Sequence, residues 1–127
     1  MLQIRQSQMK LFAREDVRNF EDWMVGHIGR HFPSRSARLG ATLLREVIRA
    51  GISRAAAYGI QSRPAVCKYV DLMIVFGRDF DVNPAYPWAA RALRDWKSES
   101  GKIDALMRAG ERAEAAARRA RGAGMPA

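Results

Sequence analysis

Two histidines, His27 and His31, stand four residues apart in a segment with helical periodicity. This spacing places both imidazoles on one face of a helix, where they could bind a single metal ion. A metal site needs a third ligand, usually a carboxylate or a cysteine, and the segment HIGRH lacks the glutamate of the helical zinc-protease motif. We therefore predict that both histidines are partly buried, hydrogen-bonded residues on an apolar helix face, and that no metal or cofactor is bound.

Other residues with catalytic potential form no recognisable pattern. The single cysteine, Cys67, excludes an internal disulfide framework and a cysteine-based zinc site. Lys68 beside it could lower the pKa of the thiol, but no triad can be traced, so we expect Cys67 to be a packing residue. Asp79, Asp81 and Asn83 alternate like calcium ligands, yet alanines stand where the bidentate glutamate is needed. The absence of a glycine-rich phosphate loop and of a serine elbow further predicts that the protein is not an enzyme.

The elements that must position these residues are helices. Between stretches of glycine and proline, the apolar residues recur with helical periodicity and without the alternation of strands. The expected helices cover five ranges, which are residues 5–31, 36–58, 62–77, 87–96 and from about 102 onward. An irregular loop of glycine, proline and aromatic residues precedes the short fourth helix. The sequence thus predicts an all-α, single-domain bundle of four to five helices.

The expected domain covers residues 1–107, and residues 108–127 form an Ala/Arg-rich tail that is either helical or frayed. Within the bundle, Pro33 should end the first helix. Gly51 marks a kink or a close helix contact in the second. Ser62 should cap the third helix.

Asp71 is an acid within a helix that is apolar nearly all round. A carboxylate in such a helix is expected to have a polar partner, because burying an unpaired charge is costly. We predict that Asp71 is hydrogen-bonded or ion-paired to another element, an arginine of the first or second helix being one candidate.

The chain has 127 residues with 22 Lys or Arg against 13 Asp or Glu, a net charge of +9. This length allows one domain, and a hydrophobic fraction of 48% is enough to build its core. No apolar run has the length of a membrane span, and the first residues lack the apolar stretch of a signal peptide. A cytoplasmic location is therefore expected.

Arg38, Arg45 and Arg49 fall on one side of the second helix, opposite its apolar arc. One interpretation is a docking stripe for phosphates or for an acidic protein surface. The other is a solvated face that acids of the first helix partly neutralise, these acids being Glu15, Asp16, Glu21 and Asp22. A nucleic-acid role is disfavoured, because the one helix that follows a short turn is too apolar to enter a groove.

Phe80, Tyr86 and Trp88 flank two prolines in the irregular loop. Phe80 and Trp88 could fold back on the third helix as a lid on the core. Alternatively, the three aromatic side chains form a docking knob for a partner protein, since aromatic residues dominate interface hot spots.

Five segments of the chain form a distinctive pattern: IRxxQ at residues 4–8, HxxxHFP at 27–33, GIxxAxxYGI at 51–60, YxDLMxxFGxDFDxNPxxPWA at 69–89 and KIDxL at 102–106. This pattern resembles that of a family of small helical proteins of proteobacteria. It covers residues 3–107 and leaves out the tail. Members of this family look like the small proteins encoded beside type VI secretion effectors, spike proteins and effector adaptors. The resemblance implies a bacterial, cytoplasmic accessory role and supplies neither a reaction nor a catalytic residue.

Together these features predict a non-catalytic, protein-binding accessory factor, foremost an adaptor or co-chaperone for a type VI secretion effector. The alternatives are an immunity protein that neutralises a co-encoded toxin and a basic nucleic-acid-binding regulator. The expected partner is an effector, adaptor or toxin encoded nearby. The expected binding surfaces are the arginine stripe and the loop aromatics.

Overall fold

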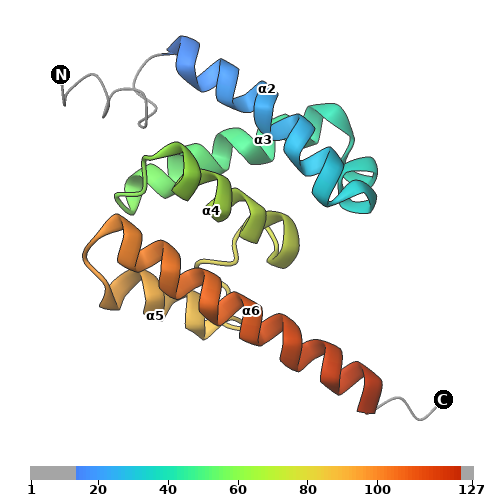
Figure 1. Ribbon diagram of the computed structural model, residues 1–127, viewed down its shortest axis with the longest axis vertical. Helices are drawn as coiled ribbons and strands as arrows, with labels where there is room; N and C mark the ends of the chain where they lie inside the picture. Colours follow the sequence, from blue (N-terminus) through green and yellow to red (C-terminus); the bar gives the residue numbers. More distant parts are fainter. Residues whose placement is uncertain (1–13, 124–127) are drawn as a thin grey trace. The chain divides into compact units, whose positions relative to one another are not determined.

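A computed structural model of the protein describes residues 14–123, which contain five α-helices and no extended strand (Figure 1). The helices are α2 (Arg14–His31), α3 (Pro33–Ala57), α4 (Arg63–Phe76), α5 (Pro87–Asp95) and α6 (Glu99–Ala123). The predicted all-α fold is confirmed. The beginning of the first expected helix lies outside the described residues.

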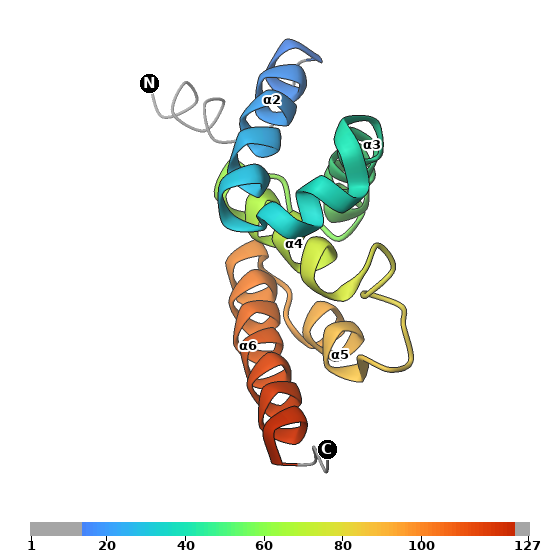
Figure 2. The same cartoon turned by 90° about the vertical axis from the view of Figure 1, so that its right-hand side faces the viewer.

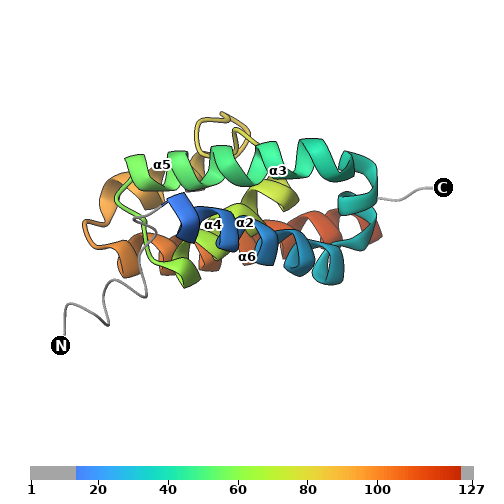
Figure 3. The same cartoon turned by 90° about the horizontal axis from the view of Figure 1, so that it is seen from above.

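The chain divides into two compact units, the first ending at Phe80 and the second beginning at Asp81. In the first unit, α3 packs against both α2 and α4, and α2 also contacts α4. Figure 3 shows α2 running alongside α3. In the second unit, the short α5 packs along α6 (Figure 2).

The core of the first unit is built from one apolar face of each helix. Its largest fully buried side chains come from all three helices and from the segments that follow α3 and α4: Phe20, Met24, Ile28, Leu44, Ile48, Ile60, Val66, Tyr69, Val70 and Phe80. Burial of this apolar surface supplies the main driving force that holds the three helices together.

Glycines and prolines set most of the helix ends, as expected. α2 ends at His31, two residues before Pro33, and α4 ends at Phe76, directly before Gly77, whose φ of 113° suits a residue without a Cβ. Ser62 precedes α4 and its carbonyl accepts the Val66 N–H at 2.9 Å, but its side chain makes no capping hydrogen bond. A serine cap binds the N–H of the second or third helical residue, and Pro64 in the second position has no N–H.

Two glycines of α3 have different roles. The helix is interrupted at Gly40, where φ is +79° and ψ is 164°, so its kink lies there and not at Gly51. At Gly51 a Cβ would meet Val70 Cγ2 at 2.7 Å and Met73 Sδ at 2.9 Å. The close-contact interpretation of Gly51 is therefore correct, since only a glycine lets α3 approach α4 this closely.

α6 begins earlier than expected, at Glu99, because Ser98 supplies a cap. The Ser98 hydroxyl accepts the Gly101 N–H at 3.0 Å. The helix then continues through the Ala/Arg-rich stretch to Ala123, so this stretch is helical. Residues 116–122 of the stretch are exposed. Among residues 14–123, no helix is long and apolar enough to cross a membrane.

Candidate functional site

Three potential metal ligands from two helices converge in the first unit. His27 comes from α2, and Cys67 and Asp71 come from α4. His27 Nε2 lies 3.0 and 3.1 Å from the two carboxylate oxygens of Asp71 and 3.6 Å from Cys67 Sγ. One ligand atom from each of the three residues lies within 4.8 Å of the other two. We call these three residues the His–Cys–Asp cluster.

Helical spacing and core packing together build this cluster. Cys67 and Asp71 are four residues apart on α4, so their side chains lie one above the other on the same face. His27 lies between the fully buried Met24 and Ile28 on the face of α2 that packs into the core. The imidazole is held from the other side by Trp23, whose ring stacks on it with centroids 5.0 Å apart. The rotation of α2 therefore directs His27 toward α4.

The geometry differs from that of a nucleophilic triad. In such a triad one imidazole nitrogen faces the nucleophile and the other faces the acid, so that the histidine can pass a proton between separate partners. In the His–Cys–Asp cluster the thiol and the carboxylate both face the same nitrogen, Nε2 of His27. The thiol and the acid therefore compete for one nitrogen instead of acting through two.

The charges around Cys67 also disfavour a nucleophilic thiolate. Burial and the neighbouring carboxylate of Asp71 raise the pKa of the Cys67 thiol to about 12, and the opposing effect of Lys68 is smaller. The thiol is therefore protonated at neutral pH in the metal-free protein. Burial likewise raises the pKa of Asp71, against the lowering effects of the His27 hydrogen bond and of the charges of His27 and His31.

The predicted pairing of Asp71 with another element is confirmed, but its partner is a histidine of α2 instead of an arginine. His27 is a partly buried, hydrogen-bonded residue, as expected, with 15% of its side chain exposed. The expectation for His31 is wrong, because this last residue of α2 is exposed. Its ring lies beside that of His27, with centroids 4.6 Å apart.

The arginine stripe divides into paired and unpaired members. Arg49 Nε donates to the Glu21 carboxylate at 3.0 Å, and Arg45 donates to Asp22 at 2.8 Å while lying 3.7 Å from Glu21. Glu21 is almost completely buried, with 3% of the residue exposed. Arg38 is exposed and makes no ion pair within residues 14–123. Acids of α2 therefore neutralise Arg45 and Arg49, as the second interpretation of the stripe predicts, but not Arg38.

Two of the four acids named from the sequence supply this neutralisation. Glu21 and Asp22 contact the arginines of α3, whereas Glu15 and Asp16 form no ion pair in the described part of the chain.

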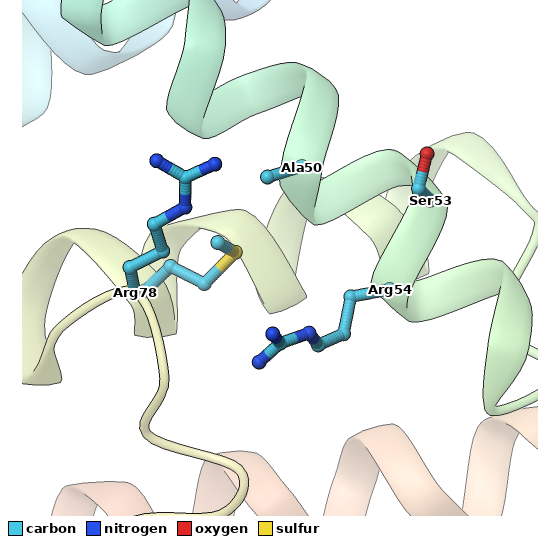
Figure 4. A pocket seen from close by; sticks show the side chains of 5 residues that line it. Ala50, Ser53, Arg54 and Arg78 are labelled. Atoms are coloured by element: carbon cyan, nitrogen blue, oxygen red, sulfur yellow. The ribbon is translucent and has the colours of Figure 1, made fainter.

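A second candidate site is an open depression of about 320 Å³ on the first unit, next to the arginine stripe. Arg54 from α3 and Arg78 from the segment after α4 line the same opening from opposite sides, and the Ser53 side chain points away from both (Figure 4). Ala50 and Met73 line its apolar part. We call this feature the basic depression.

The two arginines of the basic depression differ in their contacts. Arg54 donates to Asp79 at 3.1 Å, whereas Arg78 is exposed and has no carboxylate partner within residues 14–123. The rim continues to Glu46 and Arg49. Sequence reasoning missed Arg54 and Arg78, because they stand in different segments and only the packing of α3 on α4 brings them together.

The residues that suggested a calcium loop have partners of their own. Asp79 binds Arg54, Asp81 is buried, and the Asn83 side chain accepts the Ala85 N–H at 2.9 Å. Asp79 and Asn83 are thus already engaged, and the expected absence of a calcium site stays a prediction.

The loop aromatics also have separate roles. Phe80 is fully buried and packs against Tyr69 of α4 with ring centroids 5.2 Å apart, so the prediction of a lid on the core is confirmed for Phe80. Tyr86 and Trp88 belong to the second unit, where their rings lie 5.9 Å apart and both are half-buried. The docking-knob interpretation therefore stays a prediction, and for Tyr86 and Trp88 alone.

Comparisons with protein-family models, with curated proteins and with solved structures found no match to this chain.

Proposed function

We propose that the protein is a non-catalytic binding factor, an adaptor or co-chaperone for a type VI secretion effector, and that it holds an acidic segment of its partner in the basic depression. The observation that carries this proposal is that two arginines, Arg54 and Arg78, line one opening from opposite sides (Figure 4). Guanidinium groups bind carboxylates through two parallel hydrogen bonds, so a pair of them suits an acidic peptide.

Arg78 is the stronger of the two anchors. It carries a charge that no carboxylate of the described chain balances, whereas Arg54 would have to share its guanidinium with Asp79. A partner carboxylate at Arg78 therefore displaces no carboxylate of residues 14–123. Met73, which also lines the depression, adds a flexible apolar surface that can adapt to a neighbouring side chain.

The surroundings of the basic depression favour a protein over a nucleic acid. Glu46 lies on its rim and Asp79 lies beside Arg54. A continuous phosphate backbone would meet these acids, whereas a peptide can present an acid to each arginine and a neutral residue to each acid. The net charge of +9 would still speed the encounter with an acidic partner.

The test is co-expression of the full chain with the products of the genes that flank its own, followed by measurement of the affinity of the purified complex. The double variant Arg54→Glu with Arg78→Glu should weaken binding at least about tenfold, in line with the loss of two charge-assisted contacts. A matched control, Arg14→Glu with Arg18→Glu, makes the same charge change at two exposed positions of α2, outside both the depression and the arginine stripe.

Wild-type affinity of the Arg54 and Arg78 variant, or equal losses in the control, would refute the proposed surface. Failure of every flanking gene product to bind would refute the adaptor role itself. Toxicity of a neighbouring gene that only this protein relieves would identify an immunity protein instead. Binding to generic duplex DNA with a steep salt dependence would identify a nucleic-acid-binding regulator.

A further inference from the structure

The His–Cys–Asp cluster has the dimensions of a metal site. Zinc binds nitrogen at about 2.0–2.1 Å, carboxylate oxygen at about 2.0–2.2 Å and sulfur at about 2.3 Å, so a tetrahedral ion sets its nitrogen ligand about 3.4 Å from oxygen and about 3.6 Å from sulfur. In the cluster, His27 Nε2 lies 3.0 Å from Asp71 Oδ1 and 3.6 Å from Cys67 Sγ. Shifts of a few tenths of an ångström would therefore place the three atoms on one zinc ion.

The direction of the contacts leads to the same conclusion. The sulfur and the carboxylate both face one imidazole nitrogen, which neither catalysis through a triad nor a simple hydrogen-bonded pair requires. An ion in the middle of three such atoms would accept a lone pair from each of them. We propose that His27, Cys67 and Asp71 bind one zinc ion, with the fourth position open to water.

The donor types select the class of metal. Imidazole and thiolate favour zinc and similar transition metals, whereas magnesium and calcium prefer oxygen ligands alone. This mixed set differs from the cysteine-based zinc site that a lone cysteine excludes. The site is also accessible, because 15% of the His27 side chain and 22% of the Asp71 side chain are exposed.

Binding of the zinc ion would release two protons from the cluster. The ion must displace the proton of the Cys67 thiol and the proton that His27 Nε2 shares with Asp71, and both protons leave to the solvent. Once the sulfur is bound, the charge of the ion stabilises the thiolate that burial otherwise disfavours. The bound ion would then link α2 to α4 through ligands from both helices.

The experiment uses the full chain after treatment with a chelator, with Co²⁺ as the spectroscopic probe and Zn²⁺ as the competitor. We expect one Co²⁺ per chain, a thiolate-to-metal charge-transfer band, visible bands of a tetrahedral ion, and loss of all of them on addition of Zn²⁺. Because Cys67 is the only cysteine, the charge-transfer band can come from no other residue. Quenching of Trp23 fluorescence by Co²⁺ should accompany it, since Trp23 stacks on His27.

Two variants test the ligand set. Cys67→Ser and Asp71→Asn should each weaken Co²⁺ binding by about 100-fold or more, because even partners of metal ligands change affinity by 10–100-fold. His31→Gln is the matched control, since it changes the adjacent histidine outside the ligand set, and it should keep the band and the affinity within a few fold. Circular dichroism of each variant checks that the helices are intact.

A measurement on the unmodified chain makes the test independent of variants. Bound Zn²⁺ should slow the alkylation of Cys67 by a thiol reagent, and a chelator should restore the rate. A Co²⁺ complex without a thiolate band, equal affinity after Cys67→Ser, or loss of binding in His31→Gln alone would overturn the proposal. Alkylation at the same rate with and without Zn²⁺ would overturn it as well.

Discussion

Two polar clusters lie on α2, one toward α3 and one toward α4, and they balance their charges differently. Toward α3, the buried carboxylate of Glu21 faces two permanently charged guanidiniums, those of Arg45 and Arg49. Toward α4, the carboxylate of Asp71 faces the titratable His27 and the neutral thiol of Cys67. Both clusters join a pair of helices, but only the first contains a permanent positive charge.

This difference in charge balance suits the two clusters to different roles, one to holding helices together and the other to binding a ligand. An acid whose partners are arginines keeps its negative charge balanced at every physiological pH, because a guanidinium does not lose its proton. Where an acid pairs with a histidine beside a thiol, all three side chains can lose protons and bind a cation. The Glu21 cluster therefore holds the helices together, whereas the His–Cys–Asp cluster can exchange its protons for a metal ion.

Without added metal, the largest expected effect comes from removing the arginines that face Glu21. Arg45→Met with Arg49→Met keeps most of the apolar stems but leaves a buried carboxylate without a cation. We expect a loss of about 2 kcal/mol in the free energy of unfolding, less than for a fully buried pair because both guanidiniums are partly in water. Urea denaturation measures the loss, and a midpoint equal to that of the wild type would show that Glu21 is not held in this way.

The next effect concerns Asp71. Asp71→Asn keeps the shape of the side chain and one acceptor for His27, so the metal-free protein should lose about 1 kcal/mol, the scale of one partly exposed hydrogen bond. With Zn²⁺ at about 100 times its dissociation constant, the wild type should gain about 2.7 kcal/mol that the variant lacks. Thermal melts with and without Zn²⁺ measure both differences, and an equal response of the two proteins would contradict the metal-ligand role.

A smaller effect is expected for Cys67→Ala without metal. The thiol is half-buried, so its removal should cost about 0.5 kcal/mol, well below the cost of a large core deletion. In Zn²⁺ the same variant should fail to show the rise in melting temperature of the wild type. A cost of several kcal/mol without metal would mean that Cys67 serves packing alone and that the two clusters do not differ as described.

The smallest effect is expected at Arg38, the member of the stripe that has no ion pair within residues 14–123. Arg38→Glu changes an exposed residue that has no ion pair in the described part of the chain, so the urea midpoint should not move measurably. The urea midpoints of this variant and of the Arg45 and Arg49 variant on the same helix can then be compared. Their difference gives the contribution of ion pairing, as distinct from that of charge alone. A marked loss for Arg38→Glu would show that the whole stripe stabilises the fold.

Much of the fold followed from local sequence signals, because helix formation and termination depend on neighbouring residues. Proline at position 33 and glycine at position 77 mark the end of α2 and of α4, and Pro87 begins α5. Missed features were also local but weak, such as the kink at Gly40 and the cap at Ser98. Neither glycine nor serine alone distinguishes such a role from an ordinary position in or beside a helix.

The sequence by itself determined that Asp71 must have a partner and that acids of the first helix could neutralise the arginines of the second, because an unpaired buried charge costs too much free energy. Only the tertiary structure decided which side chains meet. His27 is separated from Cys67 by 40 residues and from Asp71 by 44, and their contact depends on how α2 and α4 are rotated against each other. Helical periodicity states which residues share a face of one helix, whereas the packing of buried side chains sets the register between helices.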